Sequence, residues 1–362
     1  MSSYSYSVHI NTLSNSIENI VMAPYRDLNN MIPVTIITGF LGAGKTTLIK
    51  NILYKLKDYQ LAIIENEFGP ESIDNELLFQ NSKEEIIELS NGCICCSIRG
   101  DLVKTLNDLK TKKLNKSLNF DHVIIETTGI ANPGPICQTF FIDNDIANYY
   151  RLDSVVALVD AKHGIDTLKN QIEAQKQIGF ADRILVSKSD LVDDKEFNLL
   201  KKHLIKINPR SPIKKTNYGD INIEDILNIN GFNLNDALDI NSEFINQEEH
   251  ICSEDCHHNN EISSFVFLSN KPFCSKKLEI VLSYLTEKYG PNMLRYKGIL
   301  YMHDTNKRII LQGVHMLMGA EQGNEWESAQ KPNTKIVFIG HKLPRELFVE
   351  KLNECTMDIS EI

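Results

Sequence analysis

Short runs of aliphatic and β-branched residues recur along the first two thirds of the chain, and segments with helical spacing separate them. Runs of this kind, without polar alternation, are typical of strands buried on both faces. They predict strands at residues 34–38, 61–64, 86–89, 122–126, 154–160, 183–187 and 212–216. Helices are expected at residues 46–57, 102–109, 166–178 and 197–206. Strands that alternate with helices predict an α/β fold with a doubly wound, mostly parallel sheet.

The pattern changes near residue 230. Residues 235–260 are polar and acidic and show no apolar periodicity, which is typical of a linker. Beyond it, strands at 262–268, 294–302, 308–316 and 335–339 with helices at 275–288 and 344–352 predict a smaller α+β domain. We therefore predict a flexible N-terminal extension (1–31), an α/β domain (32–232), a polar linker (233–261) and an α+β domain (262–362).

Composition restricts the function classes. The chain has 362 residues, 42% of them hydrophobic and 24% charged, as in a globular protein with a full core. Its net charge of −10 argues against a nucleic-acid-binding surface, and no apolar run reaches the roughly 20 residues of a membrane span. The first thirty residues hold one arginine and no lysine and resemble neither a secretory signal nor a transit peptide. A cytoplasmic location without membrane or nucleic-acid partners is expected.

The first predicted strand leads into a glycine-rich loop and then a helix. Gly39, Gly44, Lys45 and Thr46 complete the pattern G-x-x-x-x-G-K-T of the P-loop. Glycines let the backbone N–H groups of such a loop approach a polyphosphate, and the helix N-terminus adds a favourable field. We expect the loop and the first turn of the helix to bind a nucleoside triphosphate. The binding residues would be Gly39, Gly42, Ala43, Gly44, Lys45, Thr46 and Thr47. Lys45 should bridge the β- and γ-phosphates and Thr46 should ligate Mg²⁺.

Two later strand ends complete the expected nucleotide site. Glu126 ends a hydrophobic strand and could hold Mg²⁺ directly or through water, while Gly129 could offer its N–H to the γ-phosphate. Asp190, in the sequence Ser-Lys-Ser-Asp, can accept hydrogen bonds from guanine N1–H and the exocyclic amine, and the Lys188 stem can pack on the base. Adenine lacks those donors, so GTP is favoured over ATP. Ser187 stands where an asparagine is usual.

Three of the eight cysteines lie within four residues, at Cys93, Cys95 and Cys96. Thiolates favour Zn²⁺ and other soft or borderline metals, whereas buried free cysteines are also common as small apolar residues. Cys95 and Cys96 point apart on an extended backbone, so a turn, or the use of only two thiols, is required. A carboxylate from the loop at residues 65–69 is a plausible further ligand.

Taken in order, these motifs resemble the CobW-like metallochaperone GTPases, and within them the bacterial YjiA type. The resemblance covers residues 32–354 and includes Asn91–Cys96, Ala131–Pro135 and Leu294–Gly298. The chain departs from the family pattern at Asn132, where aspartate is usual, and after Gly69, where an acidic residue is usual.

The resemblance implies a GTPase that binds zinc, or a related metal such as Co²⁺ or Ni²⁺, and delivers it to a client metalloprotein. It implies Glu65, Cys95 and Cys96 as metal ligands, with Cys93 as a further candidate. Nucleotide- or metal-dependent homo-oligomers are a further expectation. A second cluster in the linker, at residues 250–258, is either a weak site for Zn²⁺, Co²⁺ or Ni²⁺ or a solvated polar stretch.

Two other functions are compatible with the motifs. The chain could be a regulatory GTPase with structural cysteines, or a metal buffer that uses nucleotide only for stability. A P-loop kinase fits less well, because no phosphoacceptor pocket is visible and Asp190 indicates guanine.

Overall fold

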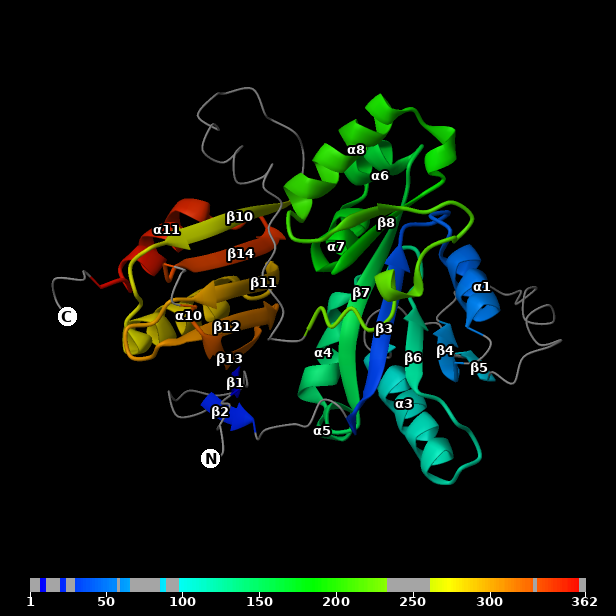
Figure 1. Cartoon of the computed structure of the whole chain (residues 1–362), viewed down its shortest axis with the longest axis horizontal. Coiled ribbons are helices and arrows are strands. Elements are labelled where there is room, and N and C mark those ends of the chain that lie inside the picture. The colour runs from blue at the N-terminus through cyan, green and yellow to red at the C-terminus, as the bar shows by residue number, and fades with distance from the viewer. Residues whose placement is uncertain are drawn as a thin grey trace. The chain divides into compact units, whose positions relative to one another are not determined.

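A computed structural model describes residues 7–10, 20–23, 30–56, 59–65, 85–88, 98–232, 261–327 and 331–357 (Figure 1). The chain forms two compact units. The first comprises residues 27–204 and 211–231, and the second comprises residues 205–210 and the described residues from Phe232 onward, with two N-terminal strands. None of the described helices is long and apolar enough to cross a membrane.

The first unit contains a sheet in which seven described strands are all parallel, in the order β5-β4-β6-β3-β7-β8-β9. Its strands are β3 (Ile32–Gly39), β4 (Leu61–Glu65), β5 (Glu85–Glu88), β6 (His122–Glu126), β7 (Tyr150–Asp160), β8 (Arg183–Ser187) and β9 (Ile213–Lys215). The central strands β3 and β7, blue and green in Figure 1, lie side by side. The predicted α/β class is confirmed.

Helices cover both faces of this sheet. They are α1 (Lys45–Lys55), α3 (Ile98–Leu114), α4 (Gly134–Ile142), α5 (Asn144–Ala147), α6 (Gly164–Asn170), α7 (Ile172–Phe180) and α8 (Asp194–Ile207). On one face α1 buries Leu48, Ile49 and Ile52 against Ile37 and Ile63 of the sheet. Helices α4, α5 and α7 pack against β7. Since the side chains of β3, β4, β6, β7 and β8 are buried on both faces of the sheet, the runs read from the sequence there are apolar without alternation.

The helix expected over residues 166–178 is two helices. The chain leaves helical geometry at Gln171, where φ is −126° and ψ is 108°. The two pieces remain connected, because Gln175 Nε2 of α7 donates to the carbonyl of Leu168 in α6 at 2.6 Å. Both helices therefore act as one packed pair beside β7.

A β-bulge interrupts the pairing of β3 with β7. Val34 pairs with Leu152 and Thr35 with Ser154, so Asp153 is the extra residue, and it is fully buried. A bulge changes the direction of a side chain at such a position. The Asp153 carboxylate accepts hydrogen bonds from the backbone N–H groups of Ile229 and Asn230, at 3.1 and 3.0 Å.

The same carboxylate belongs to a buried polar network. Arg151 Nη1 donates to it at 3.4 Å, Ser154 Oγ at 3.1 Å and Thr35 Oγ1 at 3.5 Å. Thr35 also shares a 2.9 Å hydrogen bond with the ring of His122. Burial, with the charge of Arg151, lowers the pKa of His122 to about 3, so that ring is neutral at physiological pH. The network ties residues 229–230 to the middle of the sheet.

The second unit contains a five-stranded antiparallel sheet among the described residues, in the order β10-β14-β11-β12-β13. Its elements are β10 (Ile262–Ser269), α10 (Ser275–Tyr289), β11 (Met293–Leu300), β12 (Lys307–Val314), β13 (Leu317–Glu325), β14 (Thr334–His341) and α11 (Arg345–Asn353). Strand β13 was not predicted, because its residues include two glycines and no β-branched side chain. A tight turn at His315, with φ of 53°, joins it to β12.

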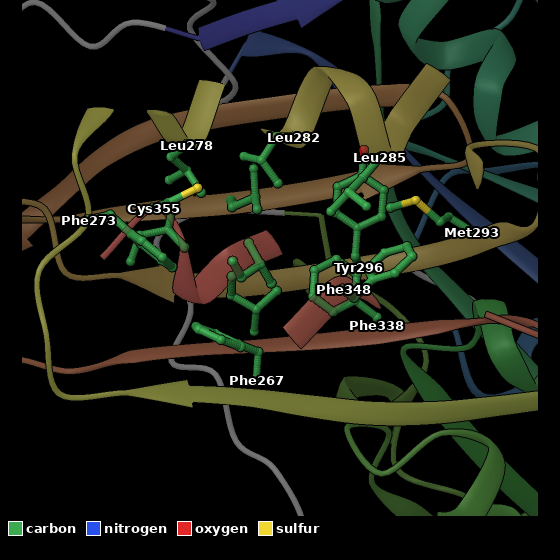
Figure 2. Packing of buried hydrophobic residues seen from close by; sticks show 14 of the residues in the cluster. Phe267, Phe273, Leu278, Leu282, Leu285, Met293, Tyr296, Phe338, Phe348 and Cys355 are labelled. Carbon is green, nitrogen blue, oxygen red and sulfur yellow. The ribbon is translucent and has the colours of Figure 1, made fainter. Parts of the chain in front are cut away.

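The core of the second unit is aromatic. Figure 2 shows Phe267, Tyr296 and Phe338 of the sheet in one cluster with Phe348 of α11 and Leu282 of α10. The ring centroids of Phe338 and Phe348 lie 5.2 Å apart in an edge-to-face arrangement, which aromatic pairs favour. Two further strands, β1 (Ser7–Ile10) and β2 (Ile20–Ala23), pair antiparallel within the segment expected to be a flexible extension.

Candidate functional site

The P-loop adopts a backbone that glycine permits. Gly42 and Gly44 have φ of 75° and 96°, in the left-handed region. A Cβ at Gly39 would lie 2.6 Å from the carbonyl oxygen of Leu158, so only glycine fits beside β7. Lys45 Nζ donates to the Gly39 carbonyl at 2.9 Å and bridges the two ends of the loop. The hydrogen bond from Lys45 therefore holds the first residue of α1 against the beginning of the P-loop.

Helix α1 begins without a side-chain cap. Its N-cap residue is Gly44, which has no side chain to accept a hydrogen bond from the first turn. Such a terminus presents backbone donors and the positive end of the helix dipole to an anion. Thr46 and Thr47 lie in this first turn. The predicted phosphate-binding residues are thus gathered at one helix N-terminus.

Ser187 connects the predicted guanine-binding segment to the P-loop. Its hydroxyl donates to the Ala43 carbonyl at 2.7 Å. The serine that replaces the usual asparagine therefore makes a direct contact with the phosphate loop. Next to it, Lys188 has a left-handed φ of 53°, and its ammonium donates to the Gly42 carbonyl at 2.9 Å. The sequence showed the motif but not these contacts.

Asp160 is a residue of this site that the sequence did not single out. It ends β7 and pairs with Lys188 at 2.6 Å. Burial alone would raise the pKa of Asp160, but the hydrogen bonds from Lys188 and from the backbone of His163 and Lys162 hold it below its usual value. The carboxylate therefore stays charged and orients the Lys188 side chain across the P-loop.

Asp190 lies in a single 3₁₀ turn, Ser189–Leu191, directly after Lys188. The turn is fixed from the other side by Asn217, whose Oδ1 accepts from the backbone N–H and hydroxyl of Ser189 at 2.9 and 2.8 Å. Asn217 comes from the segment after β9, far from the motif in sequence. The sequence alone does not indicate this role of Asn217, because the contact depends on β9 lying next to β8 in the sheet.

The segment after β6 lies against the P-loop. Thr127 is buried, and it donates through its N–H to the Ile37 carbonyl at 3.0 Å and through its hydroxyl to Thr38 at 2.9 Å. A Cβ on Gly129 would lie 2.5 Å from the Leu41 side chain. Gly129 is therefore a close-approach position, where any side chain would push the loop away.

Glu65 and Glu126 are register partners on the neighbouring parallel strands β4 and β6. Neighbouring strands are about 4.8 Å apart, and register partners share a face of the sheet. Glu88 of β5 occupies the next register position beyond Glu65. The residue expected to bind the transported metal and the residue expected near Mg²⁺ are thus adjacent at the carboxyl edge of the sheet.

The predicted thiol ligands Cys93, Cys95 and Cys96 lie outside the described residues, as do the cysteines and histidines at 250–258. Within the described ranges no group of three or more His, Cys, Asp and Glu side chains could hold a metal ion. Asn132, where the family usually has aspartate, accepts a hydrogen bond from the Gly134 N–H at 3.0 Å at the start of α4. An amide oxygen fills this role as a carboxylate would.

A cavity of about 240 Å³ lies beside the P-loop. Its walls are Phe40 to Ala43 of the loop, the end of β7, and residues of α6 and α7 that include Thr167, Gln177 and Ile178. It separates the phosphate loop from the helix pair over part of their interface.

Comparisons with known proteins agree with this architecture. Residues 33–215 match the model of the CobW/HypB/UreG nucleotide-binding domain, and residues 262–356 match that of the cobalamin synthesis protein cobW C-terminal domain. The zinc chaperone YjiA of Escherichia coli K12 is 39% identical over 322 residues, which are 88% of this chain and 96% of that protein. The zinc-regulated GTPase metalloprotein activator 1 of Schizosaccharomyces pombe is 36% identical over 208 residues, covering 56% of this chain and 50% of that protein.

A solved structure extends the similarity to three dimensions. The crystal structure of the Zn(II)-bound YjiA GTPase from E. coli matches with a TM-score of 0.72 and 32% identity, over 91% of this chain and all of that one. The two domain models, the P-loop geometry and this match agree. The chain belongs to the CobW family of P-loop GTPases.

Proposed function

We propose that this chain binds zinc and couples GTP hydrolysis to the delivery of that zinc to a client metalloprotein. The observation that carries the proposal is the register pairing of Glu65 with Glu126. It makes the carboxylate that we propose as a zinc ligand a neighbour of the carboxylate that we propose for the nucleotide site. Similar proteins named as a zinc chaperone and as a zinc-regulated GTPase metalloprotein activator support zinc as the metal and GTP as the nucleotide.

In this proposal the nucleotide is bound by the first unit alone. The N–H groups of residues 42–47 bind the phosphates, Lys45 bridges the β- and γ-phosphates, and Gly129 donates its N–H to the γ-phosphate. Thr46 and Glu126 offer the oxygen ligands that Mg²⁺ prefers, and the ion would neutralise charge on the phosphates. Lys188 packs on the base and Asp190 reads guanine.

Zinc would be bound by Glu65 together with thiolates from Cys93, Cys95 and Cys96. A set of sulfur ligands with one carboxylate suits Zn²⁺ in tetrahedral geometry. If the state of the γ-phosphate changes zinc affinity, zinc must change GTP affinity by the same factor. This reciprocity separates a metallochaperone from a GTPase with structural cysteines.

The double substitution Cys95→Ser/Cys96→Ser tests the coupling. We expect at least a tenfold loss of Zn²⁺ affinity, and the loss of any difference in that affinity between the GDP-bound and GTP-analogue-bound protein. Competition titration with a chromophoric chelator measures both values, and the same assay with Co²⁺ and Ni²⁺ ranks the metals. Cys274→Ser is the matched control, since this free cysteine lies in the second unit. Unchanged zinc affinity in both nucleotide states would contradict the proposal.

The guanine assignment is tested by Asp190→Asn. Hydrogen bonds to a charged group contribute about 1.5–3 kcal/mol, so GTP affinity should fall by about 10- to 100-fold. Xanthosine triphosphate should gain affinity, because it carries a carbonyl where guanine has its amine and the new amide can donate to that oxygen. Fluorescent-nucleotide displacement measures both ligands. A GTP preference that survives the change shows that another residue reads the base.

A further inference from the structure

Gln177 on α7 is a buried polar residue for which the GTPase site described so far has no role. Its side chain is 1% exposed. The amide nitrogen donates to two backbone carbonyls, those of Gly129 and Ala131, each at 3.1 Å. An amide nitrogen has two hydrogens, so both hydrogen-bond donors of the Gln177 side chain bind the loop that follows β6.

Those two carbonyls lie on either side of Ile130, which is 51% exposed. The loop after β6 is thereby held at three places. Thr127 donates a hydrogen bond to β3, and the Gly129 backbone lies in close contact with Leu41 of the P-loop. Gln177 binds the Gly129 and Ala131 carbonyls from α7. The Gly129 N–H shares a rigid peptide plane with the Thr128 carbonyl, which accepts a hydrogen bond from the Ala131 N–H at 3.1 Å. Gln177 holds the Gly129 and Ala131 carbonyls of this turn, and so restricts how the Gly129 N–H can rotate.

The surroundings of Gln177 permit it to release the loop. Gln177 is one of the residues that line the 240 Å³ cavity beside the P-loop, so its side chain borders open space. Its neighbour Gln175 is equally buried but donates to Leu168 of α6 and so connects the two helices. A path of direct contacts thus leads from the Gly129 loop through Gln177 to the α6–α7 pair.

We propose that Gln177 is a positioning residue that sets the orientation of the Gly129 peptide for the γ-phosphate, and that it transmits the nucleotide state to α6 and α7. The inference rests on the proposed role of Gly129. It requires the bonds from Gln177 to differ between the GTP and GDP states. A ligand shifts an equilibrium only by its differential affinity for the two states, so removing Gln177 must change GTP and GDP binding unequally.

The test compares Gln177→Met with Gln175→Met in the full chain. Both changes keep the side-chain length and remove amide donors from the same buried helix. We expect the ratio of GTP-analogue to GDP affinity to fall about tenfold in Gln177→Met, with GDP affinity unchanged, and to stay at the wild-type value in Gln175→Met. Gln177→Glu should lower the ratio at least as far, because a carboxylate faces two carbonyl oxygens. An equal fall in both methionine variants, or none in Gln177→Met, overturns the proposal.

A second measurement needs no variant. In wild-type protein, amide hydrogen exchange of residues 127–133 and of α7 should change together when the GTP analogue replaces GDP. A change in residues 127–133 without a change in α7 would contradict the proposal that Gln177 transmits the nucleotide state to α7. The Gly129→Ala variant separates the role of Gly129 from the role of Gln177. If Gly129→Ala lowers the affinity ratio and Gln177→Met does not, only the role of Gln177 fails. If Gly129→Ala has no effect, the role of Gly129 fails first, and this inference fails with it.

Discussion

Substituting Lys45 with alanine should reduce kcat/KM for GTP hydrolysis by at least about 100-fold, the usual cost of losing a donor aimed at developing charge. Lys45 is the first residue of α1, and its ammonium donates to the Gly39 carbonyl at 2.9 Å across the mouth of the loop. It is thereby held where the phosphates would bind. The alanine variant removes a positive charge from a site that must neutralise several negative ones.

Phosphate release under multiple turnover measures the effect, with Lys50→Ala on the same helix as the matched control. We expect Lys50→Ala to retain hydrolysis within about twofold, since Lys50 lies beyond the first turn of α1 and outside the residues expected to bind the nucleotide. The experiment also separates the proposed function from a metal buffer that needs nucleotide only for stability. Turnover that persists in Lys45→Ala would mean that the hydrolysis measured does not come from this P-loop.

Substituting Asp153 with alanine should destabilise the first unit by about 3–5 kcal/mol, the range for breaking a buried ionic group by removing one partner. The change leaves the backbone N–H groups of Ile229 and Asn230, and the Arg151 guanidinium, without the acceptor that they share. Burial raises the pKa of Asp153 above its usual value, and its hydrogen bonds and the charge of Arg151 oppose that rise, so the network favours the charged carboxylate.

The single tryptophan allows the effect to be assigned to one unit. Trp326 lies in the second unit, and its fluorescence therefore reports unfolding there, whereas far-ultraviolet circular dichroism reports both units. We expect Asp153→Ala to shift only the circular dichroism transition of the first unit and to speed amide exchange at Ile229 and Asn230. Asp166→Ala, an exposed carboxylate in the first turn of α6, is the control and should change stability by less than about 0.5 kcal/mol. Unchanged exchange at residues 229–230 would show that the carboxylate does not hold this segment.

The sequence was most informative where chemistry and structure are both local. A P-loop needs its glycines, Lys45 and Thr46 within eight positions, so the strand, the loop and the helix could be predicted together. The strands β3, β4, β6, β7 and β8 of the first unit were predicted well because both of their faces are buried, which makes the apolar runs continuous. The same reasoning missed β13, whose residues are only partly buried and include two glycines. It also merged α6 with α7, because helical periodicity continues across the break at Gln171.

The tertiary structure decided which of these local features meet. Glu65 and Glu126 lie 61 positions apart, and only the pairing of β4 with β6 makes them neighbours. Gln177 looks like any polar residue of an amphipathic helix until the Gly129 loop is placed beside it, and Asp153 looks like a polar interruption of a strand until the bulge directs it inward. Residue types and their spacing determine which groups can bind phosphate, guanine or metal. Which carbonyl an amide reaches, or which strand ends share an edge, depends on sheet order and register, and these arise from packing between segments that are distant along the chain.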